Sequence, residues 1–532
     1  MAQAGFIDRL DFGAPGEYRR LDIEAPSKTS AGLLVPARGS LEALAETAFS
    51  EIAFRMPESQ ARAFAAIAAD ENAQEAERFV AVSLLRNAAI AAEGLLPICQ
   101  DTGTAVVYGW KGGGFLSAEG EDDEAAIAMG TAHAWSKHRL RFSQLAPLDM
   151  LSERNTRDNL PAAIDIRSVP GDSYRFLFAA KGGGSTSRTS LSMESPASLN
   201  QESFGRLLRT RIEALGTSGC PPYTIAAVLG GATPSQTLYA LELAVFGLLD
   251  RLPRSAEADG CPLRDEAWEA EMLCAAAGSG LGAQWGGAHM ASEARAIRLS
   301  RHAANLPFAV GIACSAHRHE RAFADASGWY LERMEADPAR FLPAKLPILR
   351  NGTDIDFDAP EETWLAALRT LKAGDTVTLS GEVAVARDAA HARILALLRE
   401  GRNPPAGFAG RPVFYAGPTE AAPGAVSGSF GPTTASRMDS YLEPFMARGL
   451  SLVTVAKGGR GARAAQVIGA HHGVYLAAIG GAAALAAREQ VSESRVAAFP
   501  ELGMEALRIV RLRRMPAIVA VDSGGIDLYA RD

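Results

Sequence analysis

The stretch TIAAVLGGA, residues 224–232, indicates the fold class most directly. It places an unbroken apolar run before a pair of glycines, a pattern typical of a strand that ends in a tight turn. The stretches TAVVYGW at 104–110 and YRFLFAAKGGGS at 174–185 repeat this pattern. Because helical sequence lies around these strands, we expect a mixed α/β (α+β) protein.

Helical sequence is clearest ahead of these strands. The segments SLEALAETAFSEIAFRM at 40–56 and EAERFVAVSLLRNAAIAAEGL at 75–95 carry apolar residues at the three- and four-residue spacing of one helix face. Ser40 is a suitable N-cap, so we expect a helix to follow it. Two further helices are expected at 235–251 and 265–277.

A proline-bearing, irregular segment at 338–360 predicts a boundary between two domains. We expect an N-terminal extension at 1–40, a larger N-terminal domain at 41–345 and a smaller C-terminal α/β domain at 346–532. The two halves then differ in organisation.

The C-terminal half alternates short strands with helices. DTVTLSGEVAVARD at 375–388 predicts a pair of strands that leads into a helix at 391–400. SLVTVAKGG at 451–459 and PAIVAVD at 516–522 predict further strands. The glycine-rich apolar run at 473–487 is shorter than the roughly 20 residues that span a bilayer, and it predicts a buried helix.

Composition limits the class of protein. The chain has 532 residues, of which 48% are hydrophobic and 21% are charged, and its formal net charge is −8. These values exclude a disordered chain and argue against a nucleic-acid binder that acts through bulk charge. The chain begins with no basic start followed by an apolar run, so no secretory signal is expected. We expect a cytoplasmic protein without a membrane or nucleic-acid partner.

Five cysteines are widely spaced: Cys99, Cys220, Cys261, Cys274 and Cys314. An odd number without a secretory context argues against a disulfide framework. Cys274 lies in a helical run and is expected in the core, and Cys261 follows Asp259-Gly260 and receives no role. The other three lie in turn-like sequence, where they can be buried inert thiols, a catalytic thiol or metal ligands.

As metal ligands, these three thiols lack the CxxC spacing of a zinc site. They can instead hold an iron–sulfur cluster and leave one iron without a protein ligand. An open iron can bind hydroxyl and carboxylate oxygen and lower the pKa of the hydroxyl group, as a dehydratase requires.

Several polar residues suit a small diacid. Asp101 stands beside Cys99, in an Asp-Thr-Gly tripeptide that also occurs in aspartic proteases, where two copies share a proton. Here only one copy is present. Arg387, Arg437 and Lys457 lie at strand or turn edges, and arginine binds carboxylate through two parallel hydrogen bonds. Taken singly, each of the three residues can also be an ordinary surface or structural charge. The KGGGS segment at 181–185 can bring backbone N–H groups close to an anion.

Taken together, nine strings resemble the class I fumarases, the iron–sulfur fumarate hydratase family that includes tartrate dehydratase-like enzymes. The strings follow the family's order and run from about residue 40 to 530. They are CQDTGTA, LRFSQLAPLDM, AKGGGS, GCPPYTIAAVLGG, GLGAQWGG, RHAANLPFAVGIACSA, LSGEVAVARDAAHA, GSFGPTTASRMDSYLEPF and VTVAKGGRG.

The resemblance implies reversible hydration of fumarate to malate, a step of the tricarboxylic acid cycle. It implies a 4Fe-4S cluster held by Cys99, Cys220 and Cys314 in the N-terminal domain, a mobile C-terminal domain that clamps the substrate, and a homodimer. In similar enzymes the substrate contacts come from positions that match Gln100, Asp101, Arg141, Gly184, Arg387, Arg437 and Lys457. The positions that match Asp101 and Thr433 are candidate general acid/base groups, and His302 matches a histidine near the site.

The chain departs from the family's usual strings near Arg188, after Cys314 and at Ser436. These departures leave the diacid open among fumarate, mesaconate (the citramalate reaction) and tartrate. A cluster-bearing sensor without turnover and a homodimeric aspartic protease are the remaining alternatives. The paired cationic residues argue against the sensor, because a sensor needs no diacid clamp.

Overall fold

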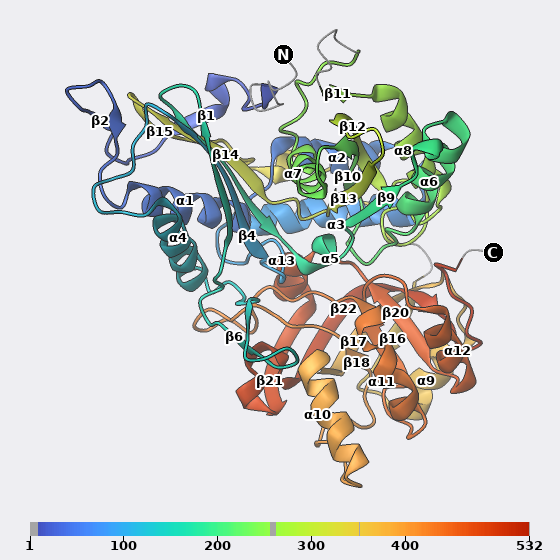
Figure 1. Cartoon of the computed structure of the whole chain (residues 1–532). Coiled ribbons are helices and arrows are strands. Elements are labelled where there is room, and N and C mark those ends of the chain that lie inside the picture. The colour runs from blue at the N-terminus through green and yellow to red at the C-terminus, as the bar shows by residue number, and fades with distance from the viewer. Residues whose placement is uncertain (1–8, 256–261, 350–351, 531–532) are drawn as a thin grey trace.

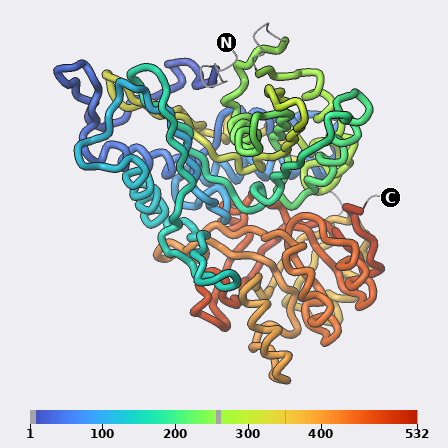
Figure 2. Tube along the Cα trace, in the orientation of Figure 1, coloured from blue at the N-terminus to red at the C-terminus, as the bar shows by residue number. Residues whose placement is uncertain are grey.

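The computed structural model describes residues 9–255, 262–349 and 352–530, and Figure 1 shows their arrangement. The chain up to about residue 340 carries a six-stranded and a five-stranded sheet, and the remainder carries a seven-stranded sheet. Figure 2 shows the orange-to-red C-terminal chain gathered in one body below the blue-to-yellow N-terminal chain. The mixed α/β fold with two domains is confirmed.

The helices of the N-terminal domain are α1 (Ser40–Phe54), α2 (Glu58–Ala69), α3 (Glu75–Ala91), α4 (Asp123–Lys137), α5 (Gly183–Thr186), α6 (Gln201–Glu213), α7 (Pro234–Val245) and α8 (Glu266–Gly278). Its strands are β1 (Tyr18–Arg20), β2 (Ser27–Lys28), β3 (Leu34–Val35), β4 (Thr104–Gly112), β5 (Leu145–Pro147), β6 (Glu153–Asn155), β7 (Ala163–Val169), β8 (Tyr174–Lys181), β9 (Ser190–Glu194), β10 (Tyr223–Gly231), β11 (Leu263–Arg264), β12 (Ala291–Arg301), β13 (Leu306–Ala313), β14 (His319–Asp325) and β15 (Gly328–Glu332).

The six-stranded sheet has the order β1-β15-β14-β8-β4-β7. Helices α1 and α4 cover one face through a buried cluster that includes Phe49, Trp135 and Phe178. Within this sheet β4 and β8 run antiparallel, and Thr104 pairs with Lys181. The segment before β4 and the glycine turn after β8 therefore leave the sheet at the same edge.

The five-stranded sheet has the order β11-β12-β10-β13-β9. Every residue of its central strand β10 is buried, because α7 packs on one face and α6 and α8 pack on the other. Strands β10 and β13 run antiparallel, and Thr224 pairs with Ala313. The loop that enters β10 thus lies beside the loop that leaves β13.

The C-terminal domain contains α9 (Glu361–Thr370), α10 (Asp388–Arg399), α11 (Asp439–Met446), α12 (Ala462–Ala470), α13 (Ala483–Leu485), β16 (Thr353–Asp356), β17 (Thr376–Val385), β18 (Val413–Phe414), β19 (Val453–Ala456), β20 (Val474–Ala478), β21 (Val491–Ala498) and β22 (Leu507–Val521). Strand β17 pairs with β18 and with β22, and β22 also pairs with β20. Since β18, β19 and β20 pair in turn, these five strands close on themselves.

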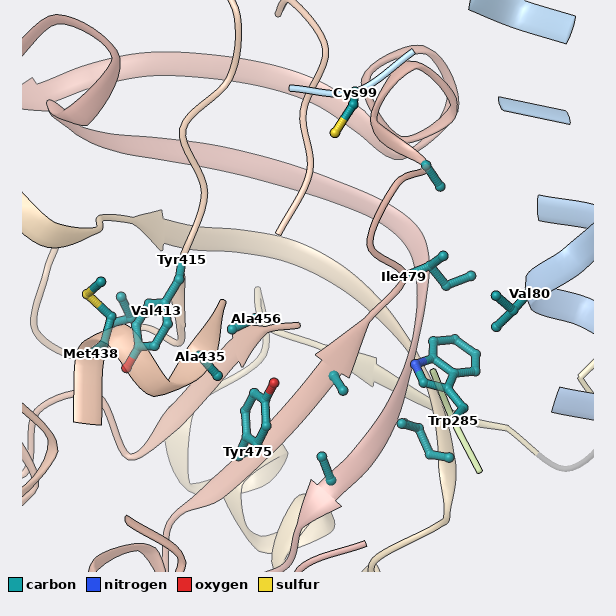
Figure 3. Close-up of a cluster of buried hydrophobic side chains, with 14 of the residues drawn as sticks. Val80, Cys99, Trp285, Val413, Tyr415, Ala435, Met438, Ala456, Tyr475 and Ile479 are labelled. Carbon is teal, nitrogen blue, oxygen red and sulfur yellow. The ribbon is translucent and has the colours of Figure 1, made fainter. Parts of the chain in front are cut away.

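One hydrophobic cluster spans both domains. It joins residues of α2 and α3 to residues around β19, β20 and α11, and Cys99 lies in it. Figure 3 shows Val80 and Trp285 of the N-terminal domain at the same cluster as Ile479 and Tyr475 of the C-terminal domain. The two domains therefore share an apolar core, and the mobility of the C-terminal domain stays a prediction.

Four local predictions differ from the structure. Cys274 in α8 is exposed, where a position in the core was expected. Cys261, which received no role, lies outside the described residues. The run 473–487 is strand β20 followed by the short α13, because its first half pairs with β19 and β22. The segment 375–388 is one strand with a register shift near Gly381, where a pair of strands was expected. Gly39 occupies the N-cap position of α1 and Ser40 is the first helical residue. Within the described residues no helix is long and apolar enough to cross a membrane.

Candidate active site

Three loops at neighbouring sheet edges carry the three candidate cluster ligands. Cys99 lies in the segment before β4, Cys220 in the loop before β10 and Cys314 directly after β13. The backbone N–H of Ser315 donates to the carbonyl of Cys220 over 2.9 Å, which joins two of these loops. Cys99 and Cys220 are buried and Cys314 is partly exposed, and no disulfide links them.

The three thiols lie close enough to influence one another's ionisation. Burial raises the pKa of Cys220 to about 12, Lys457 opposes this rise, and negative charge on Cys314 and Cys99 adds to it. Burial likewise raises the pKa of Cys99, and Cys314 contributes to that rise. Among the described residues, no three His, Cys, Asp or Glu side chains converge tightly enough to hold a single metal ion.

The donor set fits a four-iron cluster better than a single ion. In such a cluster each cysteine binds a different iron, so the ligands surround the cluster and need not meet at one point. Cys99, Cys220 and Cys314 provide three soft ligands in a largely buried, electrostatically connected setting. Two buried basic side chains, Arg318 and Lys457, can offset the negative charge that thiolates bring.

Lys457 connects the C-terminal domain to the Cys220 loop. It directly follows β19, and its Nζ donates to Cys220 Sγ over 2.7 Å. Burial alone would lower the pKa of Lys457, but the neighbouring thiol groups raise it above its usual value. A Cβ placed on Gly184 would lie 3.6 Å from Nζ, so the lysine and the glycine turn after β8 face each other.

Asp101 forms the acidic centre of the site. Its Oδ1 accepts from Arg141 Nη2 over 2.7 Å, and its Oδ2 accepts from the backbone N–H of Gly183 over 2.9 Å. Burial raises the pKa of Asp101, but Arg141, Arg318, Lys457 and the Gly183 N–H together outweigh burial and lower it to about 2. The carboxyl group is therefore ionised and firmly held at neutral pH.

Two arginines from different domains meet at Gly417. Arg141 Nη1 lies 3.4 Å from the carbonyl oxygen of Gly417. A Cβ on Gly417 would lie only 2.7 Å from Arg387 Nη1, so the close approach requires glycine. Burial lowers the pKa of Arg141 and the charge of Arg387 contributes to that decrease. Two buried guanidinium groups so close to each other form a natural site for a carboxylate.

The guanidinium group of Arg387 forms a hydrogen bond to the described residues through only one of its three nitrogens. Its Nη2 donates to Glu505 Oε1 over 2.5 Å, and the other oxygen of Glu505 accepts from the backbone N–H of Ala389 in α10 over 2.7 Å. Arg387 Nε and Nη1 are buried and make no hydrogen bond to any described residue, although Nε lies 3.4 Å from Asp388 Oδ2. These N–H groups remain available to an anion.

Gln100 and Thr433 line the same region. The Nε2 of Gln100 donates to the carbonyl of Pro432 over 3.0 Å, and a Cβ on Gly431 would lie 2.3 Å from its Oε1. Thr433 is buried, and its carbonyl accepts from the backbone N–H of Lys457 over 3.0 Å. The segment before Thr433 therefore lies against the Cys99 loop, across the domain boundary.

Arg437 and His302 lie farther out. Arg437 is half-exposed and pairs with Asp388 over 2.7 Å, so it stands at the rim beside Arg387. His302 is exposed in the turn between β12 and β13, at the opposite end of β13 from Cys314. A strand of that length spans roughly 25 Å, so the structure does not bring His302 to the other site residues within one chain.

Four residues at the site were not predicted. Arg318 lies near Asp101 and Cys99, and Glu505 orients Arg387. Asn87 and Gln284 are buried amides that connect the Cys99 and Cys220 loops to the Gly480–Leu485 segment. Arg318 stands two residues after the string that contains Cys314, and Gln284 lies in the string GLGAQWGG, so both had a usable signal. Asn87 and Glu505 lie in helical or loop sequence without such a signal.

Comparisons with known proteins show what this chain is similar to. A family model described as fumarate hydratase matches residues 42–322, and one described as the fumarase C-terminus matches residues 328–532. "Fumarate hydratase 2" of Leishmania major is 40% identical over 92% of this chain and 87% of its own length. "Fumarate hydratase class I, aerobic" of Escherichia coli is 39% identical over 93% and 91%. The "L(+)-tartrate dehydratase subunit beta" of Escherichia coli is 35% identical over 31% of this chain and 82% of its own length.

Proposed function

The chain belongs to the class I fumarate hydratase family and is a lyase, and from this premise we propose that it catalyses the reversible hydration of fumarate to malate. The resemblance inferred from the nine strings is thereby confirmed. Membership of a lyase family over most of the chain excludes the aspartic protease alternative.

One observation supports a dicarboxylate substrate most strongly. Arg141 and Arg387 come from different domains and approach each other at Gly417, and Arg387 Nε and Nη1 are buried without a hydrogen-bond partner among the described residues. Like charges at this distance repel, and unpaired buried donors cost free energy. A bound carboxylate removes both penalties, so we propose that one carboxylate of the substrate binds there.

We propose that Cys99, Cys220 and Cys314 hold a 4Fe-4S cluster. When bound, the cluster supplies a Lewis-acid iron without a protein ligand that lowers the pKa of the hydroxyl group added to the substrate. Lys457 and Arg318 provide compensating positive charge beside these thiols. Gly184 leaves space in front of Lys457, where a second carboxylate can approach its ammonium group.

Proton transfer completes the reaction. Hydration places a hydroxyl group on one carbon and a proton on the other, and the negative charge that develops meanwhile on the second carbon is stabilised by the guanidinium groups nearby. Asp101 and Thr433 remain the two candidates for holding this proton. The low pKa of Asp101 favours the carboxylate form, so Asp101 can accept a proton only if its contacts with Arg141 and Gly183 loosen. A free Thr433 hydroxyl is itself a poor base.

The choice of diacid is a separate proposal. The match to a tartrate dehydratase subunit covers less than a third of the chain, whereas the matches to fumarate hydratases cover more than nine tenths. Fumarate is therefore the substrate that we propose. Mesaconate and tartrate are the competitors against which it should be measured.

The experiment uses anaerobically purified protein that has been reconstituted with iron and sulfide. Fumarate, mesaconate and tartrate are supplied in turn, before and after exposure to air. We expect rapid malate formation from fumarate, loss of that activity in air, and a lower kcat/KM for the other two diacids. A fully loaded cluster without turnover of fumarate would contradict the proposed substrate, and failure to load a cluster would contradict the cysteine assignment.

We also propose a homodimer. Because His302 lies far from the site within one chain, it can contribute only if a second chain supplies it. Light scattering gives the oligomeric state, and mixing a His302→Ala chain with a Cys99→Ala chain tests whether the site is shared. If His302 acts across the interface, the mixed dimer regains one intact site. A cytoplasmic location stays a prediction.

A further inference from the structure

A cavity of about 510 Å³ lies between the two domains, beside the candidate active site. Its lining includes Arg188, Thr217 and Ser218 of the N-terminal domain and Ser436, Gly459 and Arg460 of the C-terminal domain. The ends of α6 and α8 and the start of α12 border it, on the side of the molecule where Figure 1 places these helices. A volume of this size suits a small ligand.

The cavity and the site share their walls. Gly184 lies in the site and Arg188 in the cavity, one helical turn further along the chain. Ser436 and Gly459 likewise line the cavity, and they follow the site residues Thr433 and Lys457 by three and two positions in the chain.

The partition between the two spaces is thin. A Cβ on Gly184 would lie 3.4 Å from the carbonyl oxygen of Ser218, and the Thr434 hydroxyl lies 3.4 Å from the same oxygen. Ser218 itself lines the cavity and stands two residues before Cys220. The contact between Thr434 and Ser218, together with the hydrogen bond from the backbone N–H of Gly459 to Thr217 Oγ1 over 3.1 Å, forms part of the wall between the cavity and the Gly184 turn.

Arg188 is a cation in the cavity whose charge is not neutralised by a carboxylate among the described residues. Its Nε is buried without a hydrogen-bond partner, and it forms no ion pair with the residues that the structure describes. Arg460, in contrast, pairs with Asp439 over 2.6 Å and lies near the rings of Tyr415 and Tyr475. Glu213 also lines the cavity, but it is exposed to solvent.

We propose that this cavity is the antechamber through which the dicarboxylate reaches the site, and that Arg188 attracts the dianion into it. The proposal rests on the proposed function, because the anion in question is that reaction's substrate. The protein as a whole carries a net charge of −8, so a dianion meets repulsion over much of the surface. A cation in a cavity with low-dielectric walls focuses the opposite potential at the entrance.

The test compares Arg188→Gln with Arg209→Gln, which removes the same charge from an exposed position on α6. Both cluster-loaded proteins are titrated with succinate, a dicarboxylate that cannot be hydrated, in a calorimeter, and assayed with fumarate. For Arg188→Gln we expect a Kd and a KM that rise about three- to tenfold at low ionic strength and approach wild type as salt screens the charge. Arg209→Gln should match wild type, and Arg188→Lys should restore most of the loss.

A second pair of variants tests the route itself. Ser436 is exposed at the cavity wall, so Ser436→Trp fills the space, whereas Ser436→Ala leaves it open. We expect Ser436→Trp to slow succinate association in stopped flow at unchanged cluster content, and Ser436→Ala to behave as wild type.

The two proposals fail in different ways. Wild-type protein with a full cluster that does not hydrate fumarate contradicts the proposed function, and the succinate titration then still decides the role of Arg188. Active wild-type protein with equal succinate affinity and KM in Arg188→Gln at low ionic strength contradicts the antechamber. Unchanged association in Ser436→Trp contradicts it as well.

Discussion

Arg387 presents one side of its guanidinium group to Glu505 and leaves Nε and Nη1 without hydrogen-bond partners. Lysine keeps the charge at this position but cannot form the two parallel hydrogen bonds of a guanidinium with a carboxylate. We expect Arg387→Lys to lower kcat/KM for fumarate by about 100-fold, or roughly 3 kcal/mol, with the cluster intact. Arg399→Lys at the exposed end of α10 is the matched control. Equal activity of the two variants would show that Arg387 does not bind substrate.

Glu505 acts on the reaction only through Arg387. It bonds both Arg387 Nη2 and the backbone N–H of Ala389, and its own pKa is lowered because the charge of Arg387 and these hydrogen bonds outweigh burial. Glutamine has nearly the same shape but only one acceptor atom. We expect Glu505→Gln to raise KM about tenfold with a smaller effect on kcat, and Glu505→Asp to recover part of the affinity. A drop in kcat at unchanged KM would contradict this positioning role.

His391 gives the stability of the protein a predictable pH dependence. Its Nδ1 lies 3.1 Å from the carbonyl oxygen of Arg387, its Nε2 is buried without a partner, and aromatic rings surround it. Burial lowers its pKa to about 4, although the Arg387 carbonyl and Glu505 oppose the decrease. The unfolded chain takes up this proton near pH 6.5, so protonation favours unfolding between pH 6.5 and 4.

The free energy of unfolding therefore decreases as pH falls from 6.5 to 4, and His391 alone accounts for a decrease of up to roughly 3 kcal/mol. Urea unfolding at neutral pH and at pH 4.5 measures the loss. His391→Gln should flatten the pH dependence, and His472→Gln at an exposed turn should leave it as in wild type. Parallel pH profiles for wild type and His391→Gln would contradict the prediction.

The residue types of the site were predictable from sequence, whereas several of their partners were not. Cys99, Asp101 and Gly184 stand in short strings with recognisable turn chemistry. Glu505 lies 118 residues after Arg387, and nothing local to it indicates a partner. A contact of that kind depends on how two chain segments pack, which single-sequence patterns do not contain.

The side-chain amide of Asn87 connects α3 to the segment before Cys99 and to the segment around α13. From α3 its amide donates to the carbonyls of Ile98 and Gly481 and accepts from the backbone N–H groups of Ala484 and Leu485. Leucine has a similar volume but leaves these four buried backbone groups unpaired. We expect Asn87→Leu to destabilise the protein by about 3–5 kcal/mol and to reduce cluster loading. The exposed Asn72→Leu serves as the control, and similar urea midpoints for both variants would contradict this role.

Elements were predictable where pattern and packing agree. The apolar run of β10 and the helical periodicity of α1 and α3 correspond to the structure. The prediction of a buried helix at 473–487 was wrong because alanine and glycine allow close packing in a helix and in a strand alike. Pairing with β19 and β22 makes the first part of this run a strand. Periodicity cannot separate a short buried strand from a short buried helix.

The two domains are expected to unfold together. The hydrophobic cluster that joins α2 and α3 to the C-terminal domain is apolar and buried. Ion pairs between the domains, such as Arg86 with Glu489, are too exposed to add much to the stability of this contact. We expect cofactor-free protein to show a single calorimetric transition. Two resolved transitions would contradict this expectation, because they would mean that the shared core stabilises each domain less than that domain's own interior does.

Sequence patterns indicated two domains and an irregular segment between them, but they did not reveal the common core. The apolar residues of α3 indicated only that one face of this helix is buried. Which surface they cover is a property of the folded chain, and here that surface belongs to the last two hundred residues.

The cover over Cys220 has a consequence for biosynthesis. Lys457, which contacts its sulfur, is made 237 residues later, and Gly480 packs against the same sulfur later still. While the ribosome is still translating the C-terminal domain, the thiol has no such cover and is open to oxidants and stray metals. The cover over Cys220 is therefore complete only in the finished chain, and a chain stalled before Lys457 is made would keep this thiol uncovered.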